Sequence, residues 1–563
     1  STIIGGSLDS FNGADVSIDT SSTLDSVDVS GDLNVQNAVT LSIENDLANN
    51  GTITINPTGN ISATQIIFND SMTVGGSGEI VLASPSTRAR ILTSDGAVVT
   101  MPATQTIRGF GRIEAEMVNN GLISADAGEI LLSTNPKTNN ATIEAINASI
   151  IEVTGITIDQ SGGGILVAND PGSQIELLGT TIIGGTLSAV PGADVTIDSS
   201  STIDGVSITG QVNVQNAQTL TVATSLSYNG VIDVNPTGNI SSTQIHFNDS
   251  MTVIGSGSIK LSAPNTRARI ETAADKTVTM SSTHTIHGQG AIEASMINNG
   301  MIVSDVIGGE IIMNINPKTN NGVIQANNDS TLEFNGITMT QGPSGQIIAD
   351  GAGSEIELRG ATMSGGFRST INGADVSVDS ASVLDGVNFS GLLNIPNGST
   401  LGITFGTLNN GLIVVNETAN ISGTQLRWDE EMILGGTGTI RLTAPGARAR
   451  LAPGVGVTQG GIGSEQRLEG VGQIAIDLIN DGTIAPGLSI GTMTATQPIF
   501  FSGVSNFEAE VNGSTSDLLD NSSTIELHGN LDIQFVDGFN PAGFWVRTVM
   551  EASDITGKFD SVS

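Results

Sequence analysis

The stretch FNGADVSIDTSSTLD, residues 11–25, returns twice in the chain with few changes. Its second copy is VPGADVTIDSSSTID at residues 190–204, and its third is INGADVSVDSASVLD at residues 371–385. The phrase NPTGNIS at 56–62 returns at 235–241 and again, as NETANIS, at 416–422. Since all of these copies lie about 180 residues apart, the 563 residues contain three copies of one long unit.

A shorter period runs inside each unit. The phrases NNGLIS at 119–124, NNATIEA at 139–145 and GGGILVA at 162–168 each join a turn to a strand, and they begin about 20 residues apart. A segment of about 20 residues cannot bury its own apolar face and has to stack on its neighbours. This spacing predicts an all-β fold, a parallel β-helix or β-solenoid rod of about 25 coils. Separate β-sandwiches are the alternative, but their strands would follow one another every 8–12 residues.

We expect the domain boundaries to follow the repeats. Repeat 1 covers 1–179, repeat 2 covers 180–360 and repeat 3 covers 361–522, and a strand-rich capping or assembly segment follows at 523–563.

Composition excludes several classes of protein. The net charge of −37 disfavours a nucleic-acid binder, which needs cationic side chains against phosphate. The chain has no Cys, which excludes disulfides and thiolate metal sites. No run approaches 18 apolar residues, so we expect no membrane insertion.

The third unit contains in full a phrase that the first two units contain only in part. LEGVGQIAIDLINDGTIAPGLSIGTMTA, residues 468–495, resembles the G-x-G … N-x-G-x-[IL]-x-P-G-x-S-x-G phrase of autotransporter-type passenger repeats, and 523–545 and 555–562 are similar to the ends of such passengers. The resemblance implies a secreted bacterial β-solenoid, located outside the cell or on its surface, in adhesion or in surface structures. No run of strands typical of a translocator barrel follows these residues.

Nine aspartates recur at equivalent positions and are the candidate metal ligands. Carboxylates repeated through a fold could bind Ca²⁺, which makes calcium the one candidate cofactor. The alternative is that these side chains bond to turns or face solvent. The residues are Asp15, Asp19, Asp25, Asp194, Asp198, Asp204, Asp375, Asp379 and Asp385.

An Arg-Ala-Arg phrase also recurs once in each unit. Residues i and i+2 of a strand lie on the same face, so each pair could grip carboxylates of its own chain, a neighbouring molecule or an anionic glycan. The pairs are Arg88 and Arg90, Arg267 and Arg269, and Arg448 and Arg450.

No nucleophile, zinc or phosphate-loop motif is visible, so we expect no enzyme and no catalytic residues. The sequence favours an extracellular structural protein that assembles with itself head-to-tail into a filament or surface fibre. An adhesin that binds a glycan or a host or biofilm matrix is the first alternative, and a polysaccharide lyase or hydrolase is the second. The predicted assembly residues are Ser1, Thr2, Ile3, Ile4, Gly5, Gly6, Phe544, Trp545 and Phe559.

Overall fold

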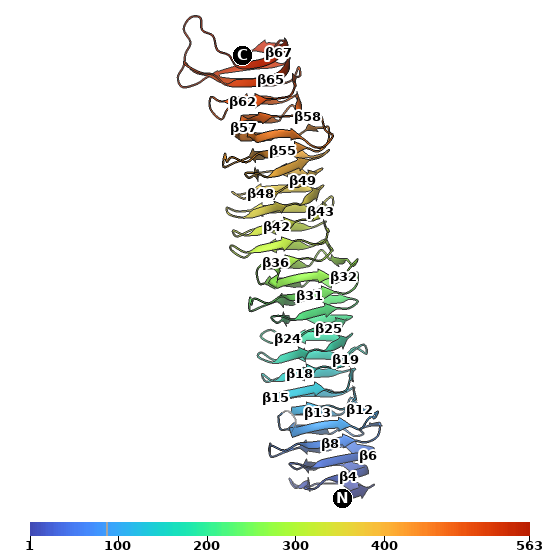
Figure 1. Cartoon of the computed structure of the whole chain (residues 1–563). Coiled ribbons are helices and arrows are strands. Elements are labelled where there is room, and N and C mark those ends of the chain that lie inside the picture. Colours follow the sequence, from blue (N-terminus) through green and yellow to red (C-terminus); the bar gives the residue numbers. More distant parts are fainter. Residues whose placement is uncertain (86–87) are drawn as a thin grey trace. The chain divides into compact units, whose positions relative to one another are not determined.

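A computed structural model describes residues 1–85 and 88–563 and, apart from Phe367, their side chains. The described residues form strands joined by turns, with one short 3₁₀ turn at Asn265–Arg267 and no α-helix among them. Their contacts divide the chain into two units, residues 1–286 and 287–563. Figure 1 shows the strands of each unit stacked in successive layers.

One coil contains three strands, each of which pairs with the equivalent strand of the next coil. In unit 1, β17 (Thr142–Ala145), β18 (Ile150–Thr154) and β19 (Thr157–Asp159) make one coil. They pair in parallel with β20 (Ile165–Ala168), β21 (Gln174–Leu178) and β22 (Thr181–Ile183). This is a parallel β-solenoid of about 25 turns, as the sequence predicts.

The interior is made of aliphatic columns. Alternate residues of each strand point inward, so the inward residues of paired strands stack from coil to coil. Ile143 of β17, Leu166 of β20 and Leu187 of β23 (Thr186–Ala189) are paired neighbours, and all three are fully buried. Burial of these side chains supplies the main stabilising free energy, at about 25 cal/mol per Å² of apolar surface.

Polar ladders run beside the aliphatic columns where the Asn-Asn turns recur. The Nδ2 of Asn119 donates to Oδ1 of Asn139 at 2.8 Å, and Asn139 donates to Oε1 of Gln160 at 2.9 Å. Unit 2 repeats the arrangement with Asn298, Asn320 and Gln341. These side chains are buried, and the ladder satisfies polar groups that would otherwise destabilise the interior.

The second repeat starts one face further round the coil than the first. In unit 1, β3 (Asp15–Ile18) pairs with β5 (Asp32–Val35), and this column continues through β7 (Thr52–Ile55) towards β17, β20 and β23. Its equivalent in repeat 2, β24 (Asp194–Ser199), belongs to the column of β18 and β21 instead. A repeat therefore advances the chain by whole coils plus one face.

Two buried side-chain groups depart from their equivalents in the other repeats. Arg368 of β47 (Phe367–Ile371) occupies the inward position that Leu187 holds one repeat earlier, between Ile347 and Phe389. Its side chain is 1% exposed, its three guanidinium nitrogens have no hydrogen-bond partner, and burial lowers the pKa of Arg368 to about 9.

The second departure is an aromatic pair in unit 1. Tyr228 and His284 pack with ring centroids 4.6 Å apart, and both are buried. Repeat 1 has an amide pair at the equivalent positions, in which Asn49 donates to Gln105 at 3.1 Å. The pair Asn409 and Gln466 in unit 2 makes the same bond at 3.0 Å.

No helix in the described part of the chain has both the length and the apolar character to cross a membrane.

Candidate functional site

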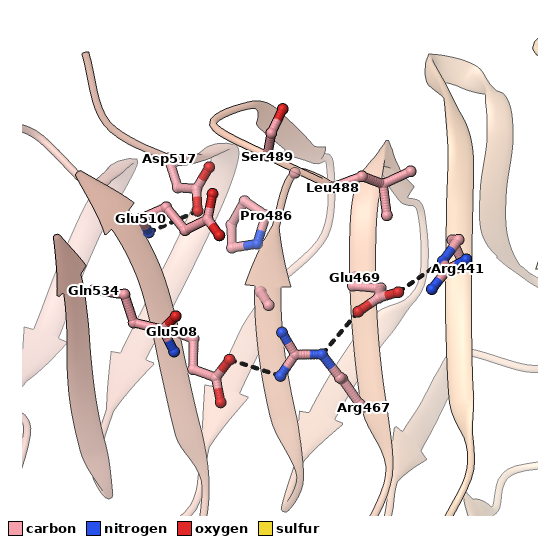
Figure 2. A pocket seen from close by; sticks show the side chains of 12 residues that line it. Arg441, Arg467, Glu469, Pro486, Leu488, Ser489, Glu508, Glu510, Asp517 and Gln534 are labelled. Atoms are coloured by element: carbon pink, nitrogen blue, oxygen red, sulfur yellow. Dashed lines mark hydrogen bonds and ion pairs between the residues drawn. The ribbon is translucent and has the colours of Figure 1, made fainter. Parts of the chain in front are cut away.

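A polar pocket of about 330 Å³ lies near the C-terminal part of unit 2, where the Pro-Gly-Leu-Ser-Ile-Gly loop follows β61 (Thr483–Pro486). Figure 2 shows the side chains that line it. They come from β57 (Thr439–Pro453), β59 (Arg467–Ile474), β61, β64 (Asn506–Val511) and β66 (Asn530–Phe535), and from the residue before β65 (Leu518–Leu527).

One wall of this pocket is a chain of ion pairs. The Nε of Arg441 lies 2.7 Å from Oε1 of Glu469, whose Oε2 lies 2.8 Å from Nε of Arg467. Arg467 also reaches Glu508, with Nη1 2.6 Å from Oε2. Each guanidinium is therefore engaged by carboxylates of the chain itself, as Figure 2 shows, and the wall offers an incoming anion no unpaired cation.

The opposite wall is organised by Asp517. Its carboxylate accepts the backbone N–H of Gly491 and that of Glu510, each at 2.8 Å, and its residue is 2% exposed. Burial raises the pKa of Asp517 to about 6 even though both hydrogen bonds favour the charged form. Asp517 thus ties the loop at 486–491 to the end of β64.

The loop requires glycine at position 487. Its φ is +94°, and a Cβ there would lie 1.9 Å from the carbonyl oxygen of Ser489 and 2.9 Å from Oδ1 of Asp517. A side chain would displace both the loop and the carboxylate that holds it. Residues 486–491, which belong to the phrase that resembles autotransporter passengers, therefore form a loop that is held in one conformation.

The substitution Asp517→Asn should loosen this loop. An amide keeps one acceptor oxygen, so one of the two N–H groups loses its partner, and we expect a loss of about 1–3 kcal/mol in unfolding free energy. Urea unfolding measures the loss, and faster hydrogen exchange at Gly491 or Glu510 locates it. Asp520→Asn changes an exposed carboxylate nearby and is the control. Equal stability of the two variants would contradict the assigned role.

A second acidic group lies on the outer side of one column in unit 2. Glu310, Glu333 and Glu357 come from the paired strands β39 (Glu310–Met313), β42 (Thr331–Asn335) and β45 (Glu355–Arg359), and their carboxylate oxygens lie within 4.8 Å of one another. Asp379 of β48 (Asp375–Ser380) continues this acidic ladder.

Arg359 and shared protons offset the repulsion within the acidic ladder. The guanidinium lies 3.2 Å from Glu333, 2.6 Å from Glu357 and 3.3 Å from Asp379. Burial raises the pKa of Glu357 to about 8, helped by its hydrogen bond to Asp379, and that bond lowers the pKa of Asp379. Burial and the charge of Glu333 raise the pKa of Glu310 to about 7. These oxygens are of the type that hard cations prefer, but Arg359 already supplies positive charge among them.

Unit 1 contains an equivalent acidic ladder that lacks a counterpart of Arg359. Its residues, from the equivalent strands, are Glu129, Glu152, Glu176 and Asp198. Leu178 stands where Arg359 does, and burial again raises the pKa of Glu129 and Glu176.

Glu310 and Glu357 should make the thermal stability of the chain rise as the pH falls from 8 to 6, against an opposite contribution from Lys137 and Lys318, whose pKa values burial lowers to about 7. Because the pKa values of the two glutamates are higher in the folded state than in the unfolded state, the folded state binds more protons there, and the stability that the glutamates contribute is lost as the pH rises through 7 and 8. Melting curves at several pH values measure the slope. Glu357→Gln should reduce it, whereas Glu465→Gln at an exposed position should not. An unchanged slope in the first variant would exclude Glu357 as its source.

The nine predicted aspartates do not gather at one place. Asp15 on β3 and Asp194 on β24 lie in different columns of unit 1 because of the one-face advance. Each of them, like Asp375 in unit 2, accepts a hydrogen bond from an Asn of the next coil, namely Asn34, Asn213 and Asn394. Asp19 accepts a bond from the Ser17 hydroxyl.

The last aspartate of each set is also bonded within the fold. Asp25 accepts from Asn45, Asp204 from Thr224 and Asp385 from Thr404. Asp198 and Asp379 adjoin the glutamate ladders, and the charge of Asp194 also acts on Glu176. The sequence analysis missed these glutamates, although their signal is present as a single Glu between apolar residues in successive coils, in GEIL, IIEV and IELL. Calcium binding stays a prediction, and melting with and without a chelator tests it.

The predicted assembly residues lie in three different settings. Ser1 and the Thr2–Ile4 strand (β1) lie against β4 (Ser22–Val29), and Gly5 and Gly6 bond to the same strand, while Ile4 stays 75% exposed. Phe559 packs against the buried rings of Phe501 and Phe507. Trp545 packs with Phe535 and Phe539, with centroids 5.6 Å apart in both contacts, whereas Phe544 is 97% exposed.

No protein-family model matches this chain, and no curated protein does. The likeness to autotransporter passengers therefore stays a prediction from the quoted motifs.

Proposed function

We propose that this chain is an extracellular structural protein, a β-solenoid subunit that associates with itself end to end into a filament or surface fibre. The stacked coils support a structural role, because their parallel pairing continues from coil to coil within each unit and the turns between strands are short. Export rests on the resemblance of residues 468–495 to secreted passengers.

The observation that carries the assembly is the segment 536–549. It is the longest strand-free segment in unit 2, and it follows β66 directly. Aromatic residues are only 3% of the chain, yet Phe539, Phe544 and Trp545 lie in this segment, and the rings of Phe539 and Trp545 pack with Phe535 at the end of β66. With Phe544 at 97% and Val546 at 66% exposure, this segment presents apolar surface of the kind found at protein interfaces. The predicted partner surface is residues 1–6 of another subunit.

Electron microscopy of the purified protein tests the proposal. We expect filaments from the wild-type chain and short or absent filaments from Phe544→Ser. The control is Phe405→Ser, which changes another exposed phenylalanine of unit 2 outside the segment. Monomers at high concentration would contradict the proposal. Glycan capture by such monomers would favour an adhesin, and release of reducing ends or unsaturated sugars would favour an enzyme.

A further inference from the structure

The NPTGNIS turn of each repeat is built around one buried asparagine. In repeat 1, Nδ2 of Asn56 donates to the carbonyls of Asn60 at 3.0 Å, of Ser62 at 3.3 Å and of Arg88 at 3.3 Å. Asn235 and Asn416 hold the same three partners in the other copies. The backbone on both sides of the isoleucine of the phrase is therefore fixed, and residue 88 or its equivalent is held against the same amide.

These rigid turns expose an isoleucine in every copy. Ile61 is 82% exposed, Ile240 is 80% exposed and Ile421 is 86% exposed. The turn itself does not need this side chain, since its hydrogen bonds run through the asparagine and backbone atoms. Proline and glycine of the phrase become Glu417 and Ala419 in the third copy, while the isoleucine is retained.

The arginine held at each turn lacks a carboxylate partner. In the Arg-Ala-Arg phrases, the second arginine bonds within the chain: Arg90 to Glu114, Arg269 to Glu271 and Arg450 to Gln425. The first arginines, Arg88, Arg267 and Arg448, have no ion pair with any carboxylate of the described residues. Three equivalent cations are thus left unpaired in a chain with 56 carboxylates and 19 Lys and Arg.

We propose that these corners, each made of an exposed isoleucine and an unpaired arginine, are contact points for a second copy of this chain lying alongside the first. The isoleucine would lose its exposed apolar surface in the contact, and the arginine would meet carboxylates of the neighbour. Each corner presents a cation to a neighbour whose surface is acidic, since carboxylates exceed cations by 37 on every copy, and this local attraction acts against the repulsion between two net-negative chains. The side-by-side contact is separate from the end contact at 536–549, although its role in a fibre rests on the proposed function.

An anionic glycan fits the corner less well. It would need several cations in a row or an aromatic platform, and each corner offers one arginine and an aliphatic side chain. Arginine, by contrast, is enriched at interfaces between proteins.

The test uses the 563-residue chain with the change Phe544→Ser, so that side-by-side association is measured apart from filament growth. Sedimentation velocity over a range of concentrations and salt gives the association constant. In this background we expect self-association once salt screens the repulsion between the two acidic chains. The triple change Ile61→Ser, Ile240→Ser and Ile421→Ser should weaken it at least tenfold. Arg88→Gln with Arg267→Gln and Arg448→Gln should also weaken it, and most strongly at low salt, where the attraction between arginine and carboxylate is least screened.

The matched control changes three exposed aliphatic residues that do not recur: Ile307→Ser, Val455→Ser and Val504→Ser. This control should associate as its parent does. Absence of self-association in the Phe544→Ser chain would overturn the inference, as would equal weakening by the control. If the wild-type chain forms bundled filaments and the triple isoleucine variant forms single filaments, both proposals are supported. If the variant filaments are still bundled, only the side-by-side contact is overturned. Arginine-dependent binding of heparin by a chain that stays monomeric would also overturn it.

Discussion

Replacing Arg368 with leucine should stabilise the chain by about 3–5 kcal/mol. A guanidinium without a hydrogen-bond partner is buried there between Ile347 and Phe389, and its lowered pKa reports the free energy that burial costs. Leucine already occupies the equivalent buried position 187 in unit 1, so the coil accommodates its shape. Calorimetry should show the melting temperature of the affected transition raised by roughly 5–10 °C.

The reverse substitution in unit 1 is the matched control. Leu187→Arg places the same cation in an aliphatic column that lacks it and should destabilise the chain by a comparable amount. If Arg368→Leu were neutral, the guanidinium would have to be solvated or paired in solution, and the column around it would have to differ from the one described here.

The effect of Arg368 should also depend on pH. The unfolded chain keeps the guanidinium protonated to about pH 12, whereas the folded chain releases the proton near pH 9. The unfolded state therefore binds more protons between these values, and the wild-type protein gains stability as the pH rises through them. The advantage of the leucine variant should accordingly shrink between pH 9 and 11, measured by urea unfolding at each pH.

The second large effect concerns Tyr228 and His284. Tyr228→Asn alone removes a fully buried ring and should cost about 3–5 kcal/mol, because a cavity remains. His284→Gln alone should cost about 1–3 kcal/mol, since it removes the ring contact and the bond between Nδ1 and the Ser281 hydroxyl. The double variant recreates the pair Asn49 and Gln105, in which Gln105 also donates to the carbonyls of Asn49 and Gly75.

A double-mutant cycle by urea unfolding measures this coupling. We expect the double variant to lose at least 1 kcal/mol less than the sum of the two single losses. The reciprocal exchange, Asn409→Tyr with Gln466→His in unit 2, is the control, and it should also be better tolerated together than singly. Additive losses in both cycles would mean that the two positions pack independently and that the exchange between repeats has no energetic basis.

The sequence predicts the fold well because the fold depends on local repetition. The Asn-Asn turns mark the coils, and the alternating Ile, Leu and Val residues mark the interior, so both can be found without long-range information. The face on which a repeat begins is different. It depends on the summed lengths of several coils, and the similar sequences around Asp15 and Asp194 contain no sign that they lie on different faces.

The acidic ladders show the same limit. Glu310, Glu333 and Glu357 lie more than 20 residues apart in the sequence, and only the register between β39, β42 and β45 brings their carboxylates together. Arg368 was missed for another reason. Arginine is ordinarily a surface residue, and only comparison with Leu187 in the same register shows that it points inward.

The one-face advance between repeats also fixes the directions in which the molecule can be approached. Ile61 follows β7 and Ile240 follows β30 (Val231–Val234), and these strands belong to different columns of unit 1. Two neighbours seated at these corners would come from different sides. Within unit 1, therefore, no single side of the solenoid presents both isoleucines, and contacts made at these two corners would not join chains into one flat layer.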